Sequence, residues 1–62
     1  MKTGGYYLAV MEMPEGSYRL TLRDQEGFPV MGTDVMELIE AVKIGRYLAQ
    51  QTRLPFREAV LP

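Results

Sequence analysis

The pattern of apolar and polar residues at the start of the chain predicts a β-hairpin. Residues 6–13 (YYLAVMEM) are dense in strand-forming residues, and both of their alternating faces are apolar, which is typical of a strand buried on two sides. Residues 14–17 (PEGS) supply proline and glycine for a turn. Residues 17–23 (SYRLTLR) then alternate between polar and apolar side chains, which predicts a second strand buried on one face.

The middle of the chain predicts a third strand followed by a helix. Residues 24–27 (DQEG) form a second turn, and residues 28–31 (FPVM) are apolar enough for a short strand that completes a meander. Asp34 is a good helix cap, because its carboxylate can accept from a free amide of the first turn while Glu37 reaches back to the amide of Asp34. We therefore expect the helix to begin at Asp34 and to end near residues 51–52.

The predicted helix carries more apolar side chains than one small sheet needs. Gly45 costs about 1 kcal/mol relative to alanine inside a helix, which predicts a close approach of the helix to a strand at this position. A stripe at three- and four-residue spacing is expected to cover the sheet, and a second apolar set is expected to serve a subunit contact. The stripe is Val35, Leu38, Ile39, Val42, Gly45 and Ala49, and the second set is Met36, Ile44, Tyr47 and Leu48.

The last residues are expected to add a short edge strand. Leu54 precedes Pro55, which forces an extended backbone, and residues 56–61 are rich in apolar side chains. The predicted fold class is therefore α+β. It comprises a three-stranded antiparallel meander, one amphipathic helix and a short C-terminal edge strand (β-β-β-α-β), within a single small domain of residues 1–62.

Composition indicates how so small a domain is stabilised and where it works. A core of this size yields roughly 3–5 kcal/mol, and the chain has no cysteine or histidine with which to add disulfides or the usual zinc sites. Self-association remains, so we expect a homodimer or a larger assembly. The absence of cysteine favours the cytoplasm, and the apolar run after residues 1–5 is too short for a signal sequence or a membrane span.

The missing side chains also argue against catalysis. Without histidine or cysteine, thiol nucleophiles and histidine-based triads are excluded. Ser17, the only serine, lies in a predicted turn, and the loop acids Asp24 and Glu26 are typical of solvated turn residues. Gly27 and Gly32 lack the lysine that a phosphate loop requires after them. We therefore predict a protein that is not an enzyme and that holds no metal and no cofactor.

Basic residues leave a nucleic-acid alternative open. Eight acids and seven bases are spread along the chain without a basic block, for a formal charge of −1. Arg19, Thr21 and Arg23 share the outward face of the second predicted strand, which we interpret first as a solvated face that prevents sheet aggregation. The alternative is a small nucleic-acid-binding regulator that uses Arg19, Arg23, Lys43 and Arg46.

Two segments carry a resemblance to a known family. Around the first two turns the matching residues are Glu15, Gly16, Ser17, Tyr18, Leu20, Leu22, Asp24 and Gly27. Residues 32–43 (GTDVMELIEAVK) follow the pattern of a glycine, a small polar pair and an acidic, aliphatic helix. Over residues 6–48 the chain thus resembles the partial RNase H-like domain of HicB-type antitoxins, although Arg23 and Glu26 replace the two loop prolines of the family.

The resemblance implies a non-enzymatic protein-interaction module. It covers only the toxin-binding part of such antitoxins, since these 62 residues contain no counterpart of their DNA-binding segment. The implied partner is a small RNase toxin, beside a second copy of the chain itself. Hydrophobic anchors give most of the affinity in such interfaces, and tyrosine and methionine are enriched there. The candidate anchors are Tyr6, Tyr7, Met11, Ile44 and Tyr47.

Overall fold

The computed structural model describes residues 5–61 and has the predicted order of elements. Three strands are followed by one helix and a final strand, so the α+β class and the β-β-β-α-β order are confirmed. The elements are β1 (Tyr7–Glu12), β2 (Tyr18–Arg23), β3 (Pro29–Gly32), α1 (Leu38–Thr52) and β4 (Phe56–Leu61).

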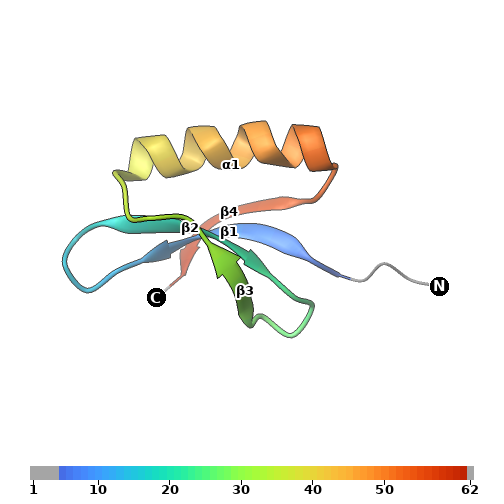
Figure 1. The fold of residues 1–62 in the computed structure, drawn as a ribbon, viewed down its shortest axis with the longest axis horizontal. Coiled ribbons are helices and arrows are strands. Elements are labelled where there is room, and N and C mark those ends of the chain that lie inside the picture. Colours follow the sequence, from blue (N-terminus) through green and yellow to red (C-terminus); the bar gives the residue numbers. More distant parts are fainter. Residues whose placement is uncertain (1–4, 62) are drawn as a thin grey trace.

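The strands form one mixed sheet in the order β3-β2-β1-β4. β1 pairs antiparallel with β2, so that Tyr7 lies opposite Arg23, and β2 pairs antiparallel with β3. β4 lies at the free side of β1 and pairs with it in parallel. It is therefore an edge strand, as predicted. α1 connects the two edge strands by crossing a single face of the sheet (Figure 1).

The core lies between α1 and the face of the sheet that it crosses. Leu8, Val10, Leu20 and Ala41 form a buried cluster there. Gly45 is buried against β4, and a Cβ atom added to it would meet the ring of Phe56 at 2.5 Å. The close approach predicted from the glycine is confirmed, because no larger residue fits at this crossing without displacing the ring.

The predicted start of the helix is wrong by three residues. The N-cap is Glu37 rather than Asp34, and Glu37 forms a capping box with Glu40. The cause is a pairing with β2: the amide of Tyr18 donates to the carbonyl oxygen of Met36 at 2.8 Å, and the amide of Met36 donates to the carbonyl oxygen of Tyr18 at 2.7 Å. These two bonds hold the chain extended before Glu37. The backbone groups of Met36 therefore pair with β2 and are not available for a helical turn.

The face of α1 that meets the sheet agrees only in part with the predicted stripe. Gly45 is buried, and Val42 and Ala49 pack against the core as predicted. Ile39 is 70% exposed, which contradicts the prediction. Ala41 is fully buried, and two residues correspond to about 200° of helix rotation, so Ile39 lies on the opposite side of α1 from Ala41.

Candidate functional site

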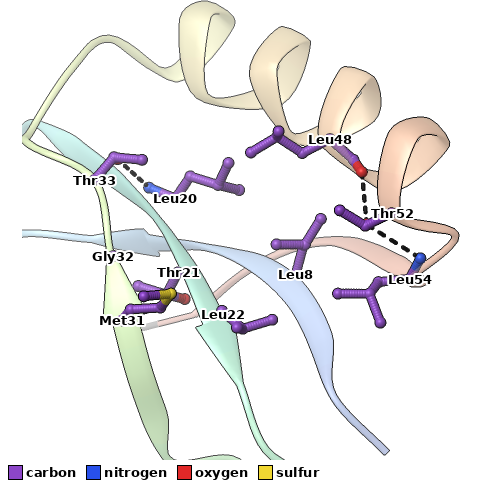
Figure 2. Close-up of a pocket in the computed structure, with 10 residues that line it drawn as sticks. All are labelled: Leu8, Leu20, Thr21, Leu22, Met31, Gly32, Thr33, Leu48, Thr52 and Leu54. Carbon is purple, nitrogen blue, oxygen red and sulfur yellow. Dashed lines mark hydrogen bonds between the residues drawn. The ribbon is translucent and has the colours of Figure 1, made fainter.

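An apolar groove opens where α1 leaves part of the sheet uncovered (Figure 2). α1 packs on β1, β2 and β4, whereas within the described chain it makes no contact with β3, whose four residues are all exposed. The groove has a volume of about 280 Å³. Its apolar lining comprises Leu8, Leu20, Leu22, Leu48 and Leu54, with Met31 on the β3 side.

The floor of the groove follows from the register of three strands. Leu8 lies opposite Leu22, and Leu22 lies opposite Met31, so the three side chains form a row on the face that α1 crosses. Met31 ends the row at the edge strand and is 66% exposed. A row of apolar side chains thus runs from the covered core out to open solvent, and this is the surface that an apolar partner would cover.

Side-chain hydrogen bonds fix the two ends of the groove (Figure 2). At one end, the hydroxyl oxygen of Thr33 accepts from the amide of Leu20 at 3.1 Å. At the other end, the hydroxyl of Thr52 donates to the carbonyl oxygen of Leu48 at 2.6 Å and accepts from the amide of Leu54 at 3.3 Å. Both ends are therefore anchored to the backbone before any partner arrives.

Two of the predicted anchors belong to the side of α1 that borders the groove. The opposite side of the helix faces β4, because Arg46 forms an ion pair with Glu58 at 3.2 Å. Leu48 lines the groove, and Ile44 precedes it by one helical turn on the same side. Tyr47 is a neighbour of Ile44 at three-residue spacing and is 59% exposed. Ile44 therefore extends the apolar surface up the wall of the groove, and Tyr47, two residues from both Gly45 and Ala49, lies beyond it toward the solvent side of α1.

The other predicted anchors do not join them. Tyr7 and Met11 alternate with Leu8 along β1 and so belong to the opposite face of the sheet, while Tyr6 precedes the strand and is 44% exposed. The ring of Tyr7 is buried beneath Arg57, whose Cζ lies 4.1 Å from the ring centroid. The five candidate anchors are therefore divided between the two faces.

The face of the sheet away from α1, named here the arginine face, carries Arg19, Thr21 and Arg23 of β2 and Arg57 of β4. Within residues 5–61 no further helix or strand layer covers it (Figure 1). Tyr7 lies opposite Arg23, and Ala9 pairs with both Thr21 and Arg57, which places all of these side chains on one side of the sheet.

The arginine face is not the solvated surface that the sequence predicts. Thr21 is 2% exposed and Arg23 is 8% exposed. The Nε of Arg23 donates to the hydroxyl oxygen of Thr21 at 3.1 Å, its Nη1 donates to the carbonyl oxygen of Gly27 at 2.9 Å, and the hydroxyl of Thr21 donates to the carbonyl oxygen of Ala9 at 2.9 Å. The prediction is wrong for Thr21 and Arg23, because the guanidinium group of Arg23 folds down onto β2 and the turn that follows it.

Arg19 contains an unsatisfied donor on this face. Its Nε is the one buried side-chain nitrogen or oxygen among residues 5–61 that has no hydrogen-bond partner. Leaving a buried donor without a hydrogen-bond partner costs about 1–3 kcal/mol, and more where the group is charged. This nitrogen is closed to solvent, so the cost falls on the folded state of the chain itself.

The structure divides the four predicted nucleic-acid residues as well. Arg19 and Arg23 lie on the arginine face, whereas Lys43 and Arg46 are exposed residues of α1, in the other layer. The third arginine on the arginine face is Arg57, which the sequence analysis did not identify. Arg57 reaches this face through the parallel pairing of β4 with β1, and a pairing between distant segments cannot be read from a local pattern of residues.

The fold defines a two-layer α+β domain in which one helix crosses a four-stranded mixed sheet. Comparisons with family models, with curated proteins and with solved structures found no match for the chain. Across residues 5–61, no helix is both long and apolar enough to cross a membrane. In the same residues, no three acidic side chains gather closely enough to hold a metal ion.

Proposed function

We propose that the chain is a non-enzymatic protein-interaction module whose groove beside α1 receives an apolar segment of another polypeptide. The observation that carries this proposal is the uncovered groove: one helix spans three of the four strands and leaves β3 exposed. Contiguous apolar surface of this kind marks interaction sites in small proteins.

The surroundings of the groove favour a polypeptide over a small molecule. Exposed apolar side chains continue beyond it, with Met31 at 66% exposure at the sheet edge and Ile44 at 38% and Tyr47 at 59% on the helix side. β3 also lies at the edge of the sheet, where unpaired backbone groups can bond to another strand. An extended partner thus finds backbone acceptors and donors beside an apolar floor.

The resemblance to HicB-type antitoxins supplies the class of partner. On that resemblance, the occupant of the groove is a small RNase toxin, and the module acts by covering the toxin. We also propose that two or more copies associate, since 62 residues without cysteine or histidine have few other means of adding stability. The same lack of cysteine favours a cytoplasmic setting.

A matched pair of helix variants tests the proposal. Tyr47 and Ile39 are both exposed residues of α1, at 59% and 70%, but only Tyr47 lies on the groove side. Tyr47→Lys is expected to weaken self-association and toxin binding at least tenfold, while Ile39→Lys leaves both unchanged. The measurements are sedimentation equilibrium over a range of concentrations and co-purification with a small RNase toxin encoded beside the gene.

Two results would contradict the proposed function. One is a strict monomer at every concentration that also fails to bind the toxin. The other is equal weakening by Tyr47→Lys and Ile39→Lys, since that would remove the groove side of α1 from the interface. The folded state of each variant is checked by its circular dichroism spectrum.

A further inference from the structure

The arginine face concentrates positive charge on a chain that is negative overall. Arg19 and Arg23 are four residues apart on β2, or about 13 Å, with Thr21 midway between them. Arg57 lies in the row of Thr21 two strands away, at about 10 Å. Three arginines therefore lie within one small area of sheet, while the formal charge of the whole chain is −1.

The described strands bring no carboxylate to balance these charges on the same face. The partners of the arginine-face residues along β1 are Tyr7, Ala9 and Met11, which are all uncharged. Glu58 follows Arg57 in β4 but bonds to Arg46 of α1 on the other side of the sheet. Along β1 and β2, the positive charge of the arginine face is thus not balanced by a carboxylate on the same face.

The three arginines differ in how far the chain itself satisfies them. Arg23 donates to Thr21 and Gly27, and Arg57 stacks on the ring of Tyr7. The Nε of Arg19 is buried without a partner. Two guanidinium groups are thus held in place by the fold, so part of the positive charge on this face is fixed before any ligand binds.

We propose that the arginine face binds the phosphodiester backbone of single-stranded nucleic acid. The planar fork of a guanidinium group matches two phosphate oxygens, and phosphates recur along a flexible strand so that several arginines can be engaged together. The site lies on the face opposite the groove, so the inference stands independently of the proposed function.

The shape of the face favours a single strand over a duplex. Arg57 lies flat on Tyr7, and Arg23 is tied down to Thr21, so neither side chain projects far enough to enter a groove of a double helix. A thin, flexible strand can instead lie across the sheet. Because Arg57 covers the ring of Tyr7, that ring offers no stacking platform, and we expect binding without sequence preference.

The number of arginines sets the expected salt dependence. Neutralising three phosphates of a single strand gives a slope of about −2 in a plot of log affinity against log salt concentration. The measurement is fluorescence anisotropy of a labelled oligothymidine titrated with the full chain at several salt concentrations. A slope near zero would overturn the proposal, as would tighter binding of a duplex or equal binding of polyglutamate.

Arg19→Met separates binding from folding. The substitution keeps the apolar stem and removes the unsatisfied donor, so the variant is expected to unfold at the same temperature as the wild type or at a higher one. Its slope should fall in magnitude by about 0.7, with weaker binding at every salt concentration. Lys43→Met removes the same charge from α1 and should leave the slope unchanged.

The pair of variants also defines failure. If Arg19→Met lowered the unfolding temperature and kept the wild-type slope, Arg19 would have only a structural role and the proposal would be wrong. If Lys43→Met reduced the slope as much as Arg19→Met did, binding would follow net charge instead of this face. Neither result would affect the test with Tyr47→Lys, which reports on the other face.

Discussion

The two faces of the sheet are buried by different means. Beneath α1, Leu8, Val10 and Leu20 are covered by a helix that brings its own apolar residues. On the arginine face, Ala9 and Thr21 are buried just as deeply, although residues 5–61 supply no second layer there. Long side chains lie across this face instead: Arg57 covers the ring of Tyr7, and Arg23 folds down to bond to Thr21 and Gly27. A domain with a single helix on one face of its sheet can thus bury both faces of its central strands.

The same comparison separates two kinds of binding surface. The helix face is incompletely covered, so what it leaves open is an apolar groove. The arginine face is covered, and its cover consists of charged side chains. The proposed partners differ accordingly, an apolar polypeptide for the groove and phosphate for the arginine face, and the mutations below test whether the two faces depend on different forces.

The largest expected effect lies on the helix face. Leu20→Ala removes a side chain that is 2% exposed and leaves a cavity beneath α1, for a loss of about 2–5 kcal/mol in the free energy of unfolding. For a domain of this size that is enough to unfold most of the protein. The check is urea denaturation followed by circular dichroism. Met31→Ala, at an exposed position in the same groove, should change stability by less than about 0.5 kcal/mol.

The arginine face should instead be sensitive to hydrogen bonding. Thr21→Val keeps the shape of the side chain but removes the hydroxyl that bonds to Ala9 and Arg23. We expect a loss of about 1–3 kcal/mol, because a buried carbonyl oxygen and a buried guanidinium nitrogen lose their partner. Thr52→Val also removes a hydroxyl that makes two hydrogen bonds, but at an exposed position where water can replace them, so it should cost less in urea denaturation. Equal effects of the two substitutions would mean that the burial of the hydrogen bonds on the arginine face adds nothing to stability.

The smallest effect concerns the crossing of α1 over β4. Gly45→Ala forces an added methyl group against the ring of Phe56, and we expect a net loss of about 1 kcal/mol in the free energy of unfolding. In a Phe56→Ala background the same substitution should stabilise by about 1 kcal/mol, since only the helix propensity then counts. Thermal unfolding of the wild type, the two single variants and the double variant shows whether Gly45→Ala raises or lowers stability in each background. A loss in both backgrounds would show that the ring is not the obstacle.

Local patterns in the sequence were sufficient for the order of the elements. The alternation of residues 17–23 and the turns on either side predicted the meander, and Gly45 predicted the helix crossing. The start of the helix was missed because Met36 pairs with Tyr18, eighteen positions earlier, and such a pairing overrides a good local cap. The parallel pairing of β4 with β1 is likewise a contact between distant segments.

The candidate site was predictable only where helix periodicity governs it. Ile44 and Tyr47 were identified as surplus apolar residues and lie beside the groove, but the alternation in β1 sends Tyr7 and Met11 to the other face. Arg57 escaped notice because its neighbours depend on strand pairing. The burial of Arg23 was missed since a period-two pattern gives the direction of a side chain, not the way in which a long one folds back.

The position of β1 has a consequence for synthesis of the protein. β1 leaves the ribosome before β2, β3 and α1, yet its second neighbour, β4, begins only at Phe56, after all of them. At about 5–20 residues per second, β1 waits roughly 2–9 s for β4, with one backbone edge unpaired. During this interval the nascent hairpin is open to pairing with another chain. A ribosome pause before Phe56 would therefore favour aggregation more than the same pause after β4 is complete.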